Sequence, residues 1–238
     1  MSNITLGKCH SWTHNEKFDN DGYFVVRNIC NSEDLYSPVP STKRGTKMEF
    51  NTSSITNYST SVEDQVPHSI ARYNYPKYRN LHNEIGEKLE DVIGRKLYTT
   101  YFYDRFYFPG QELERHRDRE SCEISFTLHV GTNLPDNLKD WPILVESPHY
   151  VESIEEFKTG HREYKNHSSI LNPGDGMLYK GCDCDHWRDP MPSPRRRKRD
   201  ILLMKKYPEY YYHQIFFHYV LQDGYNAHFA YDNGRGKS

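Results

Sequence analysis

The sequence predicts a single, mainly β domain of the antiparallel sandwich or jelly-roll type, with flanking helices (α+β). Short runs of β-favouring residues, separated by turn residues, follow one another after residue 95 of the 238-residue chain. Aromatic residues make up 14% of the chain, with twenty tyrosines, so we expect a core of rings and short strands. One convincing helix precedes these strands, which argues against an alternating α/β order.

The first part of the chain is expected to support this sheet. Residues 1–18 are polar and predict a loosely packed arm. A strand is predicted over residues 23–29, and Ser32 with the acids after it predicts the start of a helix. Residues 37–69 are rich in Ser, Thr and Asn, which predicts a loop with one or two short strands.

The best helix prediction covers residues 78–93. Its apolar residues recur at helical spacing, and Gly94 is placed to end the helix. These residues are Leu81, Ile85, Leu89, Val92 and Ile93. Such a stripe predicts a helix that packs on the outside of the sheet and carries no chemistry.

The strands of the predicted sheet follow this helix. Residues 97–107 form the first strand, and residues 122–131 form another that alternates between polar and apolar side chains. This alternation places one face in a core, while the polar face either lines a pocket or meets water. Further strands are expected over residues 141–146, 177–179 and 213–220.

Composition and charge limit the classes of function. A formal net charge of −2 provides no general attraction to nucleic acid or to an anionic membrane. Five cysteines do not indicate a disulfide framework, and no apolar segment suggests a signal peptide or a membrane span, so we expect a reducing cytoplasm. The basic run from Arg195 to Arg199 is either a solvated loop or a contact for an acidic partner.

The central stretch, residues 106–118, is interpreted as a strand, a Pro109-Gly110 turn and a second short strand that ends at His116-x-Asp118. Residues i and i+2 of an extended chain face the same side, so the His116 imidazole and the Asp118 carboxylate converge. An imidazole and a carboxylate match two of the three ligands of a 2-His-1-carboxylate iron site. A lone His-x-Asp also occurs by chance at a solvated strand end.

A second stretch strengthens the metal hypothesis. Residues 172–188 contain a tight turn, a short strand and then His186. The order Tyr-x-Pro-Gly, His-x-Asp, Gly-Asp-x-x-x-Tyr, His and a final aromatic strand extends from Leu97 to Val220. This order resembles the Fe(II)/2-oxoglutarate-dependent dioxygenases, and more narrowly their prolyl-hydroxylase-like branch.

The resemblance implies a fold and an activity. It implies a double-stranded β-helix as the catalytic core over residues 96–225, a supporting region over residues 1–95 and a tail over residues 226–238. It also implies an Fe(II)- and 2-oxoglutarate-dependent dioxygenase that uses O2, most simply a hydroxylase. The motifs do not identify the substrate, which is a small molecule or a peptidyl side chain.

The resemblance also implies roles for particular residues. His116, Asp118 and His186 would bind the iron, leaving adjacent coordination positions for 2-oxoglutarate and dioxygen. Tyr107 stands where a family tyrosine helps to bind 2-oxoglutarate. His129 projects from the polar face of its strand and would touch the same co-substrate.

The anchor for the distal carboxylate of 2-oxoglutarate is where this chain departs from the family. The usual anchor is an Arg or Lys of the last core strand, and the strand over residues 213–220 contains neither. We favour Arg188, because an extended His-x-Arg sends both side chains to one side and a guanidinium can bind a carboxylate bidentately. The alternatives are that Arg188 pairs with an acid such as Asp189, and that the basic run or Lys205 is the anchor.

Other interpretations stay open at this point. One is a catalytically silent jelly roll that acts as a binding or structural protein. Another is a zinc-stabilised β-sandwich interaction module, with Cys182-x-Cys184-x-His186 as soft ligands. His213 or His218 could replace His186 as the third iron ligand, although the two face opposite sides of their strand.

Overall fold

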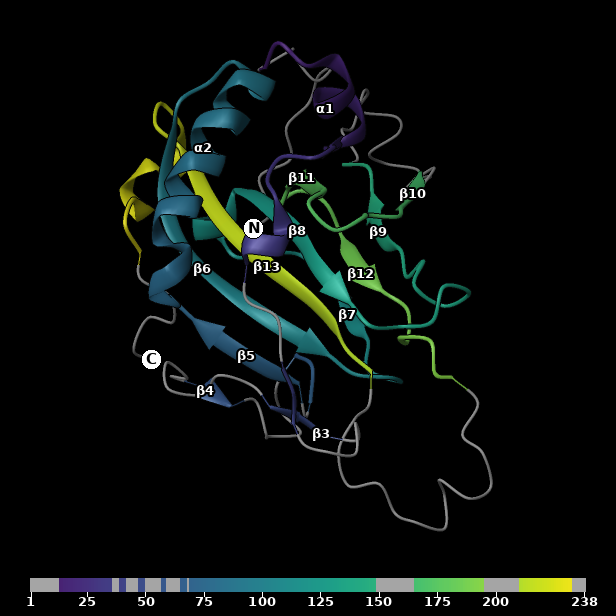
Figure 1. Ribbon diagram of the computed structural model, residues 1–238. Coiled ribbons are helices and arrows are strands. Elements are labelled where there is room, and N and C mark those ends of the chain that lie inside the picture. Colours follow the sequence, from purple (N-terminus) through teal and green to yellow (C-terminus); the bar gives the residue numbers. More distant parts are fainter. Residues whose placement is uncertain are drawn as a thin grey trace.

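The structure is a computed structural model that describes residues 13–35, 39–41, 47–49, 57–58, 65–67, 69–148, 165–194 and 210–232 (Figure 1). Its α-helices and 3₁₀ turns are α1 Glu16–Asp21, η1 Ser32–Asp34, η2 Pro76–Tyr78, α2 Arg79–Ile93, η3 Glu120–Cys122 and η4 Tyr225–Phe229. Its strands are β1 Tyr23–Val26, β2 Val39–Ser41, β3 Lys47–Glu49, β4 Asn57–Tyr58, β5 Ile70–Tyr73, β6 Leu97–Tyr107, β7 Leu113–His116, β8 Ile124–Thr132, β9 Ile143–Glu146, β10 Asn166–Ser169, β11 Gly176–Lys180, β12 His186–Arg188 and β13 Tyr212–Leu221.

Two antiparallel sheets form the body of the molecule. The larger has the order β1-β11-β8-β13-β6-β5-β4, and the smaller has the order β10-β9-β12-β7. From β6 onward the chain passes repeatedly between them, so that β6, β8, β11 and β13 lie in one sheet and β7, β9, β10 and β12 in the other. This interleaving is the double-stranded β-helix, or jelly roll, and the fold class predicted from the sequence is confirmed.

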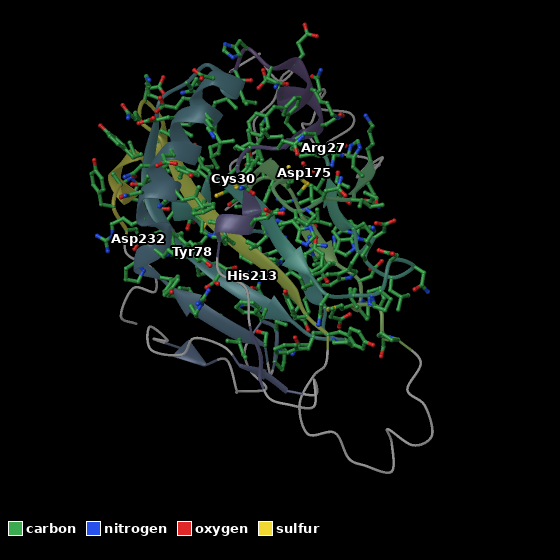
Figure 2. All side chains as sticks on the ribbon, in the orientation of Figure 1. Arg27, Cys30, Tyr78, Asp175, His213 and Asp232 are labelled. Carbon is green, nitrogen blue, oxygen red and sulfur yellow. The ribbon has the colours of Figure 1, made fainter. Side chains whose placement is uncertain are left out.

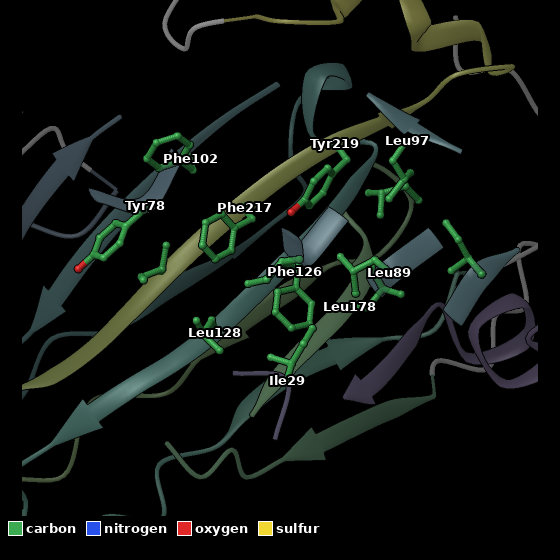
Figure 3. Packing of buried hydrophobic residues seen from close by; sticks show 14 of the residues in the cluster. Ile29, Tyr78, Leu89, Leu97, Phe102, Phe126, Leu128, Leu178, Phe217 and Tyr219 are labelled. Atoms are coloured by element: carbon green, nitrogen blue, oxygen red, sulfur yellow. The ribbon is translucent and has the colours of Figure 1, made fainter. Parts of the chain in front are cut away.

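The hydrophobic core lies between the larger sheet and α2. Phe126 of β8 and Phe217 of β13 pack there with Leu89 of α2 (Figure 3). All ten residues of β13 are buried, because the helix covers one face of this central strand and the smaller sheet covers the other. The sheet therefore has an apolar outer face and a separate inner face between the two sheets.

Helix α2 begins and ends close to the predicted positions. It starts at Arg79, after the 3₁₀ turn η2, and stops at Gly94, whose φ of 69° is left-handed and whose N–H donates to the Glu90 carbonyl at 2.7 Å. Gly86 lets the helix approach the sheet, since a Cβ there would lie 2.9 Å from the Tyr219 ring. The apolar stripe and the terminating glycine thus acted as predicted.

The N-terminal arm predicted over residues 1–18 needs correction in its described part. Residues 16–21 form α1, whose first turn is capped by the Asn15 side chain, which accepts a hydrogen bond from the Phe18 N–H at 3.0 Å. Phe18 is fully buried in the core. The helix is only six residues long and has one large apolar residue, so it produces no periodic pattern in the sequence.

The helix predicted from Ser32 is also wrong. The segment is a single 3₁₀ turn, and its cap is the Asn31 side chain, which accepts from the Glu33 N–H at 3.1 Å. The preceding strand ends at Val26, earlier than predicted, because Asn28 takes a left-handed φ of 50° that a strand cannot continue through.

Further expectations concern the loop over residues 37–69, the cysteines, a membrane span and the basic run. Short strands β2, β3 and β4 lie in the predicted loop over residues 37–69. The cysteines of the described part, namely Cys30, Cys122, Cys182 and Cys184, are all free thiols. Among the described helices, none has the length and apolar character needed to cross a bilayer. The basic run from Arg195 to Arg199 lies outside the described residues.

Candidate metal centre

Three ligand-type side chains converge on the inner face, where β7 and β12 pair. The Nε2 atoms of His116 and His186 lie 3.6 and 3.5 Å from the Asp118 Oδ1 atom. One donor atom of each residue lies within 4.8 Å of the others. His116 and Asp118 are neighbours because of their spacing in an extended chain, whereas His186 arrives because the pairing register of β12 places it opposite His116.

Hydrogen bonds on the far side of each imidazole orient the two rings. The Nδ1 atom of His116 lies 2.7 Å from the Glu114 carbonyl, and that of His186 lies 3.1 Å from the Cys184 carbonyl. A carbonyl only accepts, so each Nδ1 carries the proton and each Nε2 lone pair faces the centre.

Asp118 is positioned by a hydroxyl and by a glycine. The Ser125 hydroxyl donates to Oδ2 at 2.7 Å, which leaves Oδ1 facing the imidazoles. The Asp118 N–H donates to the Gly181 carbonyl at 2.9 Å. A Cβ on Gly181 would lie 2.7 Å from Asp118 Oδ2 and 2.8 Å from the Ser125 Oγ atom, so only glycine leaves room for this carboxylate. Neither residue stands out in the sequence as part of a site.

The charges of the three groups suit a divalent metal. Burial would raise the pKa of Asp118, but the interactions of its carboxylate with the adjacent imidazoles of His186 and His116 hold this pKa well below its ordinary value. Burial would lower the pKa of His186, whereas the Asp118 carboxylate raises it. An ionised carboxylate and two imidazoles are the donors that a facial-triad Fe(II) site uses, so the residues present fit that ion.

Gln65 also reaches the centre, and no motif in the sequence indicates it. Its Nε2 atom lies 2.7 Å from the His116 Nε2 atom. The adjacent Val66 is fully buried in an apolar cluster with aromatic residues of β6 and β13, among them Tyr212. Residues 65–67 therefore cover the inner face beside the three ligands.

Arg188 points into the same interior and is 1% exposed. Its Nη1 atom donates to the Trp141 carbonyl at 2.5 Å, and its guanidinium carbon lies 4.6 and 4.9 Å from the ring centres of Trp141 and Tyr212. Nε and Nη2 have no hydrogen-bond partner, and within the described ranges no acid forms an ion pair with Arg188. The alternative of a pair with Asp189 is therefore not seen.

Tyr107 lies beside this guanidinium. It is fully buried, and its hydroxyl lacks a hydrogen-bond partner in the described part of the chain. Burial raises the pKa of Tyr107, while the nearby positive charges of Arg105 and Arg188 oppose that rise. The hydroxyl is therefore a neutral donor held close to two cations.

His129 completes this group of inward-facing polar residues. Its Nδ1 atom lies 2.7 Å from the Leu171 carbonyl, its ring stacks on Tyr212 at 4.1 Å, and its Nε2 atom is unpaired among the described residues. The pKa of His129 is lowered to about 3, mainly by burial and in part by the positive charge of Arg188. The polar face of β8 thus faces the protein interior. The alternation in the sequence had left open whether this face meets water, and it does not.

The two alternative histidines lie on opposite faces of β13, as predicted. His213, whose position on β13 is labelled in Figure 2, faces the outer side of the sheet. Its Nε2 atom lies 2.7 Å from the Asp104 Oδ2 atom. His218 faces inward and forms, with Asp118 and Cys122, a second group of three potential ligands within 4.8 Å of one another. Of the two, only His218 is placed to approach a metal at the centre.

The cysteine-based zinc site finds no support in the described residues. Cys182 and Cys184 belong to neither of the two groups of potential ligands there. Burial is the main cause that raises the pKa of the Cys184 thiol to about 12. A zinc ligand has to be a thiolate, so this environment is unfavourable for it.

Comparisons with known proteins agree with the fold. No family model matches the chain, and no curated protein matches its sequence. Among solved structures, HygX from Streptomyces hygroscopicus with nickel and 2-oxoglutarate bound aligns at a TM-score of 0.51 and 10% identity, covering 86% of this chain and 84% of that one. A prolyl-4-hydroxylase from Pseudomonas putida aligns at a TM-score of 0.48 and 8% identity, covering 85% and 95%. This chain therefore has the double-stranded β-helix fold of HygX.

Proposed function

We propose that this protein is an Fe(II)- and 2-oxoglutarate-dependent dioxygenase, in its simplest form a hydroxylase. The observation that carries the proposal is the convergence of His116, Asp118 and His186 on the inner face of a double-stranded β-helix. Three ligands on one side of an octahedral ion leave adjacent positions open for other ligands. When bound there, ferrous iron and 2-oxoglutarate would activate dioxygen, so that one oxygen atom enters succinate as CO2 is released and the other oxidises a C–H bond of the substrate.

The chain's own groups hold and orient the ion. The carbonyls that accept from each Nδ1 fix both imidazoles with Nε2 toward the centre. The Ser125 hydroxyl fixes the Asp118 carboxylate through Oδ2 and keeps Oδ1 available. Such outer contacts set the direction of each ligand before the metal arrives.

Arg188 is the proposed anchor for the distal carboxylate of 2-oxoglutarate. Its unpaired Nε and Nη2 atoms share one edge of the guanidinium, which matches the two oxygens of a carboxylate. The same edge of Arg72 binds the carboxylate of Asp104 elsewhere in this chain. The unpaired hydroxyls of Tyr107 and Tyr212 lie close enough to add neutral hydrogen bonds.

The test is iron binding and 2-oxoglutarate turnover without a primary substrate. His116→Ala, Asp118→Ala and His186→Ala should each abolish Fe(II) binding at micromolar metal and stop succinate release, with unchanged circular dichroism. His228→Ala, at an exposed histidine, is the matched control and should change neither. If His186→Ala keeps full iron affinity, the third ligand is misassigned and His218 should be tested.

The primary substrate is not identified by these contacts. The run from Arg195 to Arg199, outside the described residues, stays a predicted contact for an acidic substrate or partner. Neutralising its cations should weaken that binding without changing uncoupled 2-oxoglutarate turnover. The effect should fade with salt, because exposed charges are screened over about 10 Å at 0.1 M ionic strength.

A further inference from the structure

A second unpaired guanidinium lies in the interior between the sheets. Arg105 of β6 is 4% exposed, and its Nε and Nη1 atoms have no hydrogen-bond partner. In the described portion of the chain, no acid forms an ion pair with it. Its close neighbours are aromatic, with the guanidinium carbon 5.6 Å from the centre of the Tyr103 ring and 5.8 Å from that of Tyr107.

Arg105 faces the same side as the proposed co-substrate site. It alternates along β6 with residues of the outer face, so it shares its direction with Tyr103 and Tyr107. Its cross-strand neighbour on β13 is Gln214, whose Nε2 atom donates to the Thr127 hydroxyl at 2.5 Å and whose Oε1 atom is unpaired among the described residues. Arg105 is therefore one of a set of inward-facing polar groups with unused hydrogen-bonding capacity.

Arg72 is a buried arginine whose charge is paired within the chain, and it serves as a comparison for Arg105. It is 1% exposed, its Nε and Nη2 atoms donate to the Asp104 carboxylate, and Nη2 also donates to the Tyr78 hydroxyl at 3.1 Å. A buried cation without such a counter-ion is strongly unfavourable. The contrast indicates that Arg105 is completed by an anion from outside the chain.

Two cations in this interior require two anionic groups. Arg188 lies over the rings of Trp141 and Tyr212, whereas Arg105 lies beside Tyr103. The distal carboxylate of 2-oxoglutarate carries one negative charge and would neutralise Arg188. Because one carboxylate neutralises only one guanidinium, the positive charge of Arg105 would still lack a counter-ion.

We propose that Arg105 binds a carboxylate of the primary substrate, so that the substrate is an organic acid. The inference rests on the proposed function, because it takes Arg188 as the anchor for 2-oxoglutarate. A planar guanidinium suits a carboxylate, because its N–H donors match the two carboxylate oxygens.

The first experiment separates a binding cation from a structural one. Arg105→Met and Arg72→Met keep an apolar stem in place of the charge, and their melting temperatures are compared without ligands. Arg105→Met should melt at or above the wild-type temperature, because it removes an unpaired buried charge. Arg72→Met should melt lower, because the buried Asp104 carboxylate loses its guanidinium partner and keeps only the His213 imidazole as a partner among the described residues. An equal fall for both variants would make Arg105 a structural cation and overturn the proposal.

The second experiment measures the site on anaerobic Fe(II)-loaded protein saturated with 2-oxoglutarate. Sodium acetate is the probe, and sodium chloride at equal ionic strength is the control. Acetate should bind the wild type, and Arg105→Met should weaken that binding by about tenfold or more, equivalent to about 1.4 kcal/mol. Arg105→Met should leave 2-oxoglutarate affinity nearly unchanged, whereas Arg188→Met should weaken 2-oxoglutarate and keep acetate.

Other outcomes refute distinct parts of the inference. Equal loss of 2-oxoglutarate affinity in Arg105→Met and Arg188→Met, with no acetate binding, would mean that one carboxylate lies between both arginines. Tighter binding of inorganic phosphate than of acetate would overturn the carboxylate assignment. A wild type that binds no 2-oxoglutarate would refute the proposed function, and acetate titration of the metal-loaded protein alone would still decide the role of Arg105.

Discussion

Replacement of Arg188 by lysine tests the proposed co-substrate anchor, because it keeps the positive charge and removes the two parallel N–H donors of the guanidinium. In the structure the Nη1 bond to the Trp141 carbonyl holds the guanidinium in place, and the Nε–Nη2 edge is unpaired. A lysine ammonium can offer a carboxylate one point contact in place of two parallel ones. A hydrogen bond to a charged group contributes about 1.5–3 kcal/mol. Loss of one such bond should therefore raise the Kd for 2-oxoglutarate by about 10- to 150-fold.

The measurement is an anaerobic titration of Fe(II)-loaded protein with 2-oxoglutarate. Arg115→Lys is the matched control. Arg115 lies on β7, the strand that pairs with β12, and it is exposed and forms ion pairs with Glu146 and Asp185. That variant should bind 2-oxoglutarate as the wild type does. Wild-type affinity in Arg188→Lys would refute the assignment and direct attention to Arg105 or to Lys205, which lies outside the described residues.

Three further predictions concern the metal centre and the core. Gly181→Ala should weaken Fe(II) binding by displacing the Asp118 carboxylate, whereas Gly131→Ala, where a Cβ meets nothing within 4 Å, should bind normally in the same titration. Ser125→Ala removes the donor to Asp118 Oδ2 and should lower metal affinity by about 10- to 100-fold, and an unchanged affinity would contradict the role of that hydroxyl. Burial lowers the pKa of His82 to about 3, so acidification from pH 6.5 toward 3 protonates this residue only in the unfolded chain and destabilises the fold by about 1.4 kcal/mol per pH unit. His82→Gln should reduce that slope in urea unfolding, and parallel curves for both proteins would rule the contribution out.

Local rules account for what the sequence by itself determined. The stripe before Gly94 specified α2, because helical spacing is a property of neighbouring residues. Alternation along residues 122–131 specified the two faces of β8, and the i, i+2 rule placed His116 beside Asp118. Local rules failed at α1 and at Ser32, where the segments are too short for a pattern and a single capping side chain decides the turn.

Only the tertiary structure decided which distant groups meet. The pairing of β12 with β7 brought His186 to His116, and the cover provided by the second sheet turned the polar face of β8 inward. Arg72 and Arg105 both lie on strands next to an aromatic residue, and nothing in their local sequence distinguishes their roles. One meets Asp104 on the outer face of the sheet and the other meets no described acid on the inner face. Their roles differ because burial and counter-ions are set by contacts between strands, which neighbouring residues along the chain do not encode.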